Sequence, residues 1–197
     1  MVYKVSRFIC WLFSVAFFPI KAYGIENIPK KGAFILASNH TSNLDPIILG
    51  VMIRKRRPSF MAKDKLFSNF FADRYMRSLG AFPVKRNQRD IGALREALER
   101  LEKGEILILF PEGTRNAQGQ VQDAQAGVGF LAAKSEAPVF PVFVEGSEKV
   151  LPKGAKLPKR SQISVYIGKQ IPIERSLPYQ DTANCIMRSV RHLSCRS

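Results

Sequence analysis

The sequence predicts a single α/β domain with a central, mostly parallel or mixed sheet flanked by helices, preceded by an N-terminal membrane-associating helix. Two observations lead to this prediction. Short apolar runs typical of buried strands alternate along the chain with stretches of helical periodicity. The 197 residues, 46% of them hydrophobic, suit one domain with a sizeable core, and no internal repeat or long linker divides them.

The first element is an uncharged segment, residues 8–20, which is rich in aromatic side chains and bracketed by Arg7 and Lys21. As a helix it spans roughly 20 Å, which is short of the ~30 Å hydrocarbon core of a bilayer. A helix in the headgroup region agrees best with the aromatic residues and flanking cations, and a buried core helix or a signal peptide is the alternative. We therefore divide the chain into a membrane-associating segment, residues 1–22, and a folded domain, residues 23–197.

Strands are predicted where short apolar runs stand between turn-forming residues. They cover residues 32–38, 58–62, 80–86, 105–110, 139–144 and 163–167. Helices are predicted where apolar residues recur at intervals of three and four, most clearly from Ile91 to Leu101 before Gly104. The other predicted helices cover residues 46–54, 66–79, 128–135 and 179–193.

One of the two histidines, His40, follows the first of these strands, and Asp45 stands five positions later. On one continuous helix the two side chains would point ~140° apart, so the turn-forming residues between them must fold the chain back. Such a loop brings the carboxylate to one imidazole nitrogen and leaves the other as a proton acceptor near neutral pH. The alternative is a loop histidine beside an aspartate that only caps the helix opening at Pro46.

A second polar block, Pro111 to Arg115, leaves the strand predicted at residues 105–110. Its proline and glycine hold Glu112 and Arg115 at the edge of the sheet, where ligands bind in α/β folds. The planar guanidinium of arginine suits a phosphate, and Arg86, at the end of another strand, is a candidate partner. Taken singly, each arginine is better explained as a surface cation.

The net charge of +15 and the isoelectric point near 10.1 indicate an anionic partner: nucleic acid, an anionic membrane or a phosphorylated substrate. No RNA-binding signature or helix-turn-helix pattern is present, so we expect no nucleic acid. A basic, non-catalytic protein that binds anionic membrane or nucleic acid is the alternative of a different class. The cysteines Cys10, Cys185 and Cys195 lack zinc-ligand spacing, which favours a reducing, cytosolic setting without a metal site.

The segment from His40 to Asp45 resembles the signature of histidine, four residues and aspartate in the glycerolipid acyltransferases, the family of lysophosphatidic acid acyltransferases. Three later blocks match that family in order, and together with the signature they extend the resemblance over roughly residues 23–170. The blocks are residues 80–86, 110–115 and 137–142. No GxSxG elbow, HExxH motif or GxxxxGK[ST] phosphate loop points to another chemistry.

The resemblance implies the glycerolipid acyltransferase fold and a role in phospholipid biosynthesis. A fatty acyl group from acyl-CoA or acyl carrier protein would pass to the free hydroxyl of 1-acylglycerol-3-phosphate, giving phosphatidic acid. Another lysolipid or an amino-lipid is the alternative acceptor. The family implies no cofactor and no metal. We expect the protein to lie on the cytoplasmic face of the membrane, peripheral or monotopic, against anionic lipids, and the oligomeric state stays open.

The site residues follow from the same resemblance. His40 is the expected base and Asp45 its orienter, while Lys63 is a possible helper. The expected acceptor site consists of Arg86, Glu112, Gly113, Thr114 and Arg115. For Glu112 we expect an architectural role, holding Arg115, His40 or a backbone turn, because a carboxylate beside a phosphate would repel it.

Overall fold

The fold is a mixed sheet between two layers of helices, seen in the computed structural model, which describes residues 2–53, 56–85, 90–115, 124–152, 155 and 157–195. Within these residues, seven strands form one sheet in the order β1-β7-β6-β2-β5-β3-β4. The strands are β1 (Ile20–Tyr23), β2 (Phe34–Ser38), β3 (Pro58–Lys63), β4 (Ala81–Val84), β5 (Ile106–Leu109), β6 (Val139–Glu145) and β7 (Ile163–Ile167). All neighbours are parallel except β6 and β7. The predicted single α/β domain, with a mostly parallel sheet flanked by helices, is confirmed.

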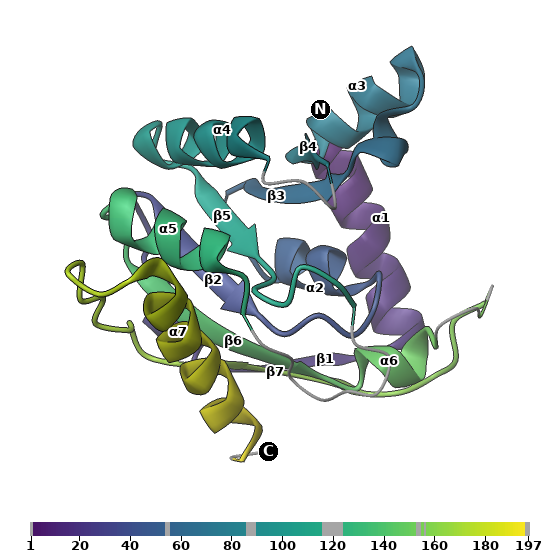
Figure 1. Ribbon diagram of the computed structural model, residues 1–197. Helices are drawn as coiled ribbons and strands as arrows, with labels where there is room; N and C mark the ends of the chain where they lie inside the picture. Colours follow the sequence, from purple (N-terminus) through teal and green to yellow (C-terminus); the bar gives the residue numbers. More distant parts are fainter. Residues whose placement is uncertain are drawn as a thin grey trace.

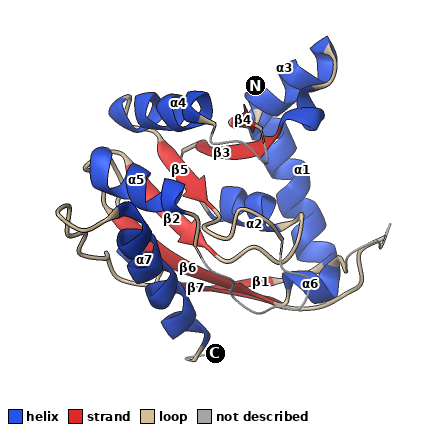
Figure 2. Cartoon of the chain, viewed as in Figure 1, coloured by secondary structure: helices blue, strands red, loops and turns tan. Residues whose placement is uncertain are grey.

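Helices cover both faces of the sheet (Figures 1 and 2). The α-helices are α1 (Val2–Phe17), α2 (Asp45–Met52), α3 (Phe70–Ser78), α4 (Ile91–Glu102), α5 (Ala126–Lys134), α6 (Ser147–Val150) and α7 (Tyr179–Ser194), and short 3₁₀ helices lie at η1 (Ile25–Asn27) and η2 (Asp64–Phe67). Helices α4, α5 and α7 pack on one face, and α2 packs on the other with α1 beside it.

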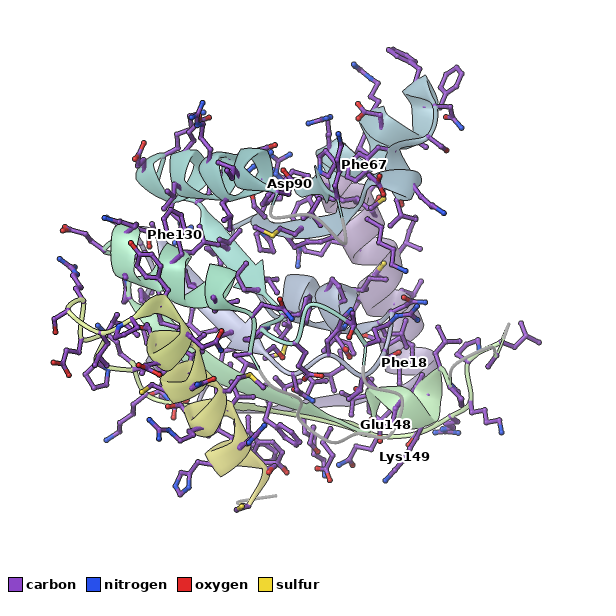
Figure 3. The ribbon with its side chains drawn as sticks, in the orientation of Figure 1. Phe18, Phe67, Asp90, Phe130, Glu148 and Lys149 are labelled. Atoms are coloured by element: carbon purple, nitrogen blue, oxygen red, sulfur yellow. The ribbon has the colours of Figure 1, made fainter. Side chains whose placement is uncertain are left out.

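The central strand β2 is buried on both faces, as a strand between parallel neighbours must be. Its side chains alternate: Phe34 and Leu36 enter the core under α2, while Ile35 and Ala37 enter the core under α4, α5 and α7. On the face of the sheet that carries α4, α5 and α7, helices α5 and α7 approach each other closely: a Cβ at Gly129 would lie 1.8 Å from the carbonyl oxygen of Tyr179. Phe130 meets the Tyr179 ring edge-on beside this contact (Figure 3).

The N-terminal segment differs from the prediction in its bounds. The helix α1 runs from Val2 to Phe17, and Ile20 begins the edge strand β1, which pairs with β7. The predicted boundary after residue 22 therefore falls inside a strand of the sheet. The strand escaped prediction because three of its four residues are exposed, so it has no alternation of apolar and polar side chains.

The helix predicted over residues 66–79 is also wrong in part. The chain instead forms η2, breaks at Ser68, and begins α3 at Phe70. The break has a local cause, because the side chain of Asn69 accepts a hydrogen bond from the main-chain N–H of Ala72 at 2.9 Å and so caps a new helix. The short helix α6 is also absent from the predicted helices, because one turn is too short to show a helical period.

The outward face of helix α1 consists mainly of apolar side chains. One side of the helix contacts α2 and α3. Phe18, the first residue after the helix, enters the core. Among the described residues, none of the helices is long and apolar enough to pass through a membrane.

Candidate active site

The site is built where the neighbouring parallel strands β6, β2 and β5 end at one edge of the sheet. His40 follows β2, Phe110 to Glu112 follow β5, and Ser147 follows β6 by way of Gly146. Gly146 has a φ of +86°, and a Cβ there would lie 2.4 Å from the carbonyl oxygen of Gln162, so only glycine fits this turn. Topology thus brings together residues that are more than one hundred positions apart.

His40 is held both by its ring and by its main chain. It stacks on the ring of Phe110, with the centroids 4.2 Å apart and the planes at 24°. The main-chain N–H of His40 donates to Oε1 of Glu112 at 3.2 Å, which ties the end of β2 to the turn after β5. The side chain remains 12% exposed, so the imidazole is oriented by the protein and still open at the surface.

Asp45 is fully buried and forms the centre of the hydrogen-bond network. Its Oδ2 lies 2.9 Å from Nδ1 of His40 and accepts the main-chain N–H groups of Thr41 and Ser42, each at 2.8 Å. An ionised carboxylate can only accept, so Nδ1 of His40 carries the hydrogen and Nε2 is the acceptor. The geometry is that of a base and its orienter.

The interpretation of Asp45 as a mere helix cap is wrong. Leu44 occupies the N-cap position with helical backbone angles, and Asp45 is the first residue of α2, followed by Pro46. Its carboxylate turns back over the preceding loop rather than forward to its own helix, because two main-chain donors and the imidazole all converge on Oδ2.

Ser147 completes the network and was not predicted. Its Oγ donates to Oδ1 of Asp45 at 2.6 Å and lies 2.9 Å from Oγ1 of Thr41, and the serine is fully buried. Both oxygens of the carboxylate are therefore held, and Asp45 cannot rotate without breaking several hydrogen bonds. The sequence carries no motif at Ser147; the only signal was its place after a buried strand, which matters once β6 is known to adjoin β2.

We expect Ser147→Ala to lower kcat about tenfold with little change in KM, because it removes one hydrogen bond to a charged group that orients the base. The measurement is steady-state acyl transfer, with thermal unfolding to check the fold. Ser164→Ala is the matched control, since Ser164 is a buried serine on β7 outside this network. Equal losses in both variants, or a change confined to KM, would contradict the role of Ser147.

The other predicted site residues that the structure describes lie at the same edge of the sheet. Glu112 is almost fully buried and contacts the main chain of His40, one of the three contacts expected for it. Gly113, Thr114 and Arg115 follow it and are exposed at the same edge of the sheet. Lys63 ends β3, the strand next to β5, and is also exposed.

Arg86 lies outside the described residues, although both sides of its segment are described. The main-chain N–H of Lys85 donates to Oδ2 of Asp90 at 2.8 Å, and Oδ1 accepts the N–H of Ala93 at 3.0 Å, so Asp90 caps α4 (Figure 3). These hydrogen bonds from Lys85 and Ala93 hold the pKa of Asp90 below its ordinary value.

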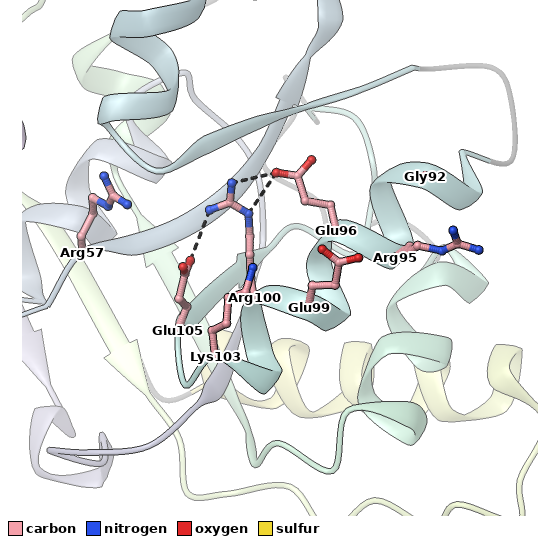
Figure 4. A pocket seen from close by; sticks show the side chains of 8 residues that line it. All are labelled: Arg57, Gly92, Arg95, Glu96, Glu99, Arg100, Lys103 and Glu105. Carbon is pink, nitrogen blue, oxygen red and sulfur yellow. Dashed lines mark hydrogen bonds and ion pairs between the residues drawn. The ribbon is translucent and has the colours of Figure 1, made fainter.

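A separate polar pocket opens at the opposite edge of the sheet (Figure 4). There Arg100 lies between two carboxylates, with Nη2 2.7 Å from Glu96 and Nη1 3.2 Å from Glu105, and it covers the ring of Phe82. Because Glu105 precedes β5 whereas Glu112 follows it, this cluster is remote from His40 and belongs to the framework that packs α4 on the sheet.

A buried carboxylate on an imidazole, at the carboxyl edge of an α/β sheet, is an arrangement that can accept and return a proton. Comparison with known proteins identifies the class. The sequence model of the family described as Acyltransferase matches residues 19–145. The chain belongs to the acyltransferase family, as the resemblance predicted.

Three relatives indicate how far the likeness extends. The chain is 30% identical over 152 residues to the 1-acyl-sn-glycerol-3-phosphate acyltransferase of Bacillus subtilis, which covers 77% of this chain and 73% of that protein. It is 30% identical over 159 residues to the chloroplastic 1-acyl-sn-glycerol-3-phosphate acyltransferase LPAT1 of Arabidopsis thaliana, and the match covers 79% of this chain and 44% of that protein. The crystal structure of the 1-acyl-sn-glycerophosphate acyltransferase PlsC from Thermotoga maritima matches all of this chain and 79% of that one, with a TM-score of 0.75 and 28% identity.

Proposed function

We propose that the protein transfers a fatty acyl group from a thioester donor to the free hydroxyl of 1-acylglycerol-3-phosphate, forming phosphatidic acid. The observation that carries the proposal is the buried Asp45 carboxylate on Nδ1 of His40, with Nε2 left as the acceptor. The relatives in Bacillus subtilis and Arabidopsis thaliana bear the name of this activity, which supports the choice of acceptor.

In the proposed reaction the acceptor hydroxyl donates its proton to Nε2 of His40 while its oxygen attacks the thioester carbonyl carbon. The carbon–sulfur bond then breaks, and the departing thiolate takes the proton from the imidazolium. Asp45 stabilises the positive charge on the ring between these steps. The enzyme returns to its starting state without a covalent intermediate, cofactor or metal.

The acceptor phosphate is proposed to bind at the turn after β5. Arg115 supplies a guanidinium and Thr114 a hydroxyl at an exposed edge, next to the Glu112 turn that is tied to His40. Arg86 remains the predicted second arginine and Lys63 a possible helper. Acyl-CoA and acyl carrier protein are both acidic donors, and the net charge of +15 suits either.

The experiment that tests this proposal is an acyl-transfer assay with both donors against a panel of acceptors. The panel contains lysophosphatidate, glycerol 3-phosphate, uncharged lysolipids and an amino-lipid. Phosphatidic acid should be the main product with at least one of the two donors, acyl-CoA and acyl carrier protein. Preference for a lysolipid without a terminal phosphate would assign another acceptor, and Arg115→Ala should then leave its KM unchanged.

We further propose that the protein sits on the cytoplasmic face of a membrane, anchored by α1. Among the side chains of this helix that the structure describes, six large apolar ones are exposed: Val2, Val5, Phe8, Ile9, Trp11 and Leu12. The cations Lys4 and Arg7 lie among them, and the combination is typical of a helix lying in the headgroup region.

Anchoring by α1 predicts how salt affects the binding of the protein to membranes. Wild-type protein on anionic vesicles should resist high salt and be released by detergent, because burial of apolar surface is not screened. Phe8→Ser/Leu12→Ser should wash off in high salt, since only attraction of the basic residues to anionic lipid remains, at about 1 kcal/mol per nearby cation. Vesicle flotation measures both. Release of the wild-type protein by salt alone would contradict the anchor.

A further inference from the structure

Helix α3 exposes apolar side chains that the proposed reaction does not use. Phe70 and Phe71 are its first two residues, and they are 72% and 81% exposed. The two rings meet edge-on, with centroids 5.7 Å apart. Phenylalanine is among the residues that proteins usually bury, so an exposed adjacent pair at the tip of a helix requires an explanation.

The surroundings of this pair are also exposed. Neither α3 nor the preceding η2, all of whose residues the structure describes, contains a buried side chain. Leu66 and Tyr75 add further apolar surface. Figure 1 shows helix α3 projecting from the body of the protein at the end where the N-terminus lies. Its apolar residues Phe70, Phe71 and Tyr75 are exposed there.

The charge around this tip is complementary to an anionic surface. Four cations, Lys63, Lys65, Arg74 and Arg77, stand against the two carboxylates Asp64 and Asp73. Arg77 pairs with Asp73 at 2.9 Å and covers the ring of Phe67, which lies at the base of α3 (Figure 3). Aromatic and aliphatic groups ringed by cations are the composition of surfaces that enter anionic bilayers.

Helix α3 also lies beside α1, whose apolar side chains face outward as described above. Two apolar elements in contact form a broader attachment than either alone, and a second point of contact restricts rotation of the protein about the first. Protein partners, by contrast, obtain most of their affinity from side chains that fill well-packed pockets, which a projecting tip does not offer.

We infer that the tip of α3, Phe70 and Phe71 with Leu66, inserts into the headgroup boundary of an anionic bilayer as a second contact beside α1. This inference rests on the proposed function, because a lysolipid acceptor lies in a membrane. An enzyme that takes its acceptor from the membrane needs a fixed orientation on the membrane surface. Docking of acyl carrier protein at the same tip is the competing outcome.

Fluorescence tests the insertion directly, because the chain contains one tryptophan, Trp11 on α1. The double variant Trp11→Phe/Phe71→Trp moves the reporter to the tip of α3. Trp11→Phe/Ile91→Trp is the matched control, since Ile91 is 70% exposed at the start of α4 on the other face of the sheet. On vesicles of phosphatidylcholine and phosphatidylglycerol, the first variant should shift to shorter wavelength and be quenched by brominated acyl chains. Emission that matches the control would overturn the inference.

Binding and activity then separate the inference from the proposed function. Phe70→Ser/Phe71→Ser should weaken vesicle affinity at least about tenfold, while Ile91→Ser changes it less than about twofold. With substrates dispersed in detergent, both variants should match wild-type activity with either donor. A loss limited to acyl carrier protein as donor would assign the tip to that protein instead. Absence of transfer by wild-type protein would refute the proposed function, and the fluorescence and vesicle-affinity measurements would still decide the role of α3.

Discussion

His40→Ala is expected to reduce kcat by about 10²–10⁴-fold, the contribution typical of a positioned general base. In the proposed reaction Nε2 accepts the hydroxyl proton, and among the described residues His40 is the one imidazole that contacts Asp45. The fold should survive, because Asp45 keeps its hydrogen bonds from Thr41, Ser42 and Ser147. Steady-state kinetics and circular dichroism measure the two effects.

The control for this variant is the second histidine. His192 is exposed in the last turn of α7 and makes none of the hydrogen bonds given above for Asp45. His192→Ala should therefore leave kcat and KM unchanged. Loss of turnover in His192→Ala with activity retained in His40→Ala would show that the base has been misassigned.

Asp45→Asn is expected to have the second largest effect, a loss in kcat of roughly 10- to 10³-fold. The amide removes the negative charge that stabilises the imidazolium, and it can accept hydrogen bonds through one atom only. Four donors meet this carboxylate, so folding should also suffer, by about 1–3 kcal/mol for a hydrogen bond to a buried charge.

Asp181→Asn is the matched control, since this carboxylate is exposed in the first turn of α7. It should retain full activity and nearly full stability. Thermal unfolding and kcat together judge the comparison. If Asp45→Asn proved as active as the control, the contact between Asp45 and His40 would have no part in the reaction.

Elements with a strong pattern of apolar residues, either a continuous run or a helical period, were predictable from the sequence. The buried strands β2, β5 and β6 are apolar runs, and α4 repeats its apolar residues at intervals of three and four. The approach of His40 to Asp45 could also be predicted, because their spacing excludes a single helix and the residues between them favour a turn.

What escaped prediction depends on neighbours in space. Ser147 reaches Asp45 only because β6 lies next to β2, and strand order is not written in local sequence. Edge strand β1 lacks a pattern because most of its side chains meet solvent. The break before α3 depends on a single capping residue, Asn69, inside a stretch that otherwise has helical periodicity.

The most direct test of the central claim is transfer of a radiolabelled acyl group in a single experiment with and without acceptor. With lysophosphatidate present, the label should appear in phosphatidic acid, and the initial rates should fit a ternary complex. Without acceptor, the protein should remain unlabelled and release no burst of thiol, because His40 acts as a base and not as a nucleophile. Label bound covalently to the protein, or none in phosphatidic acid, would contradict direct transfer through His40 and Asp45.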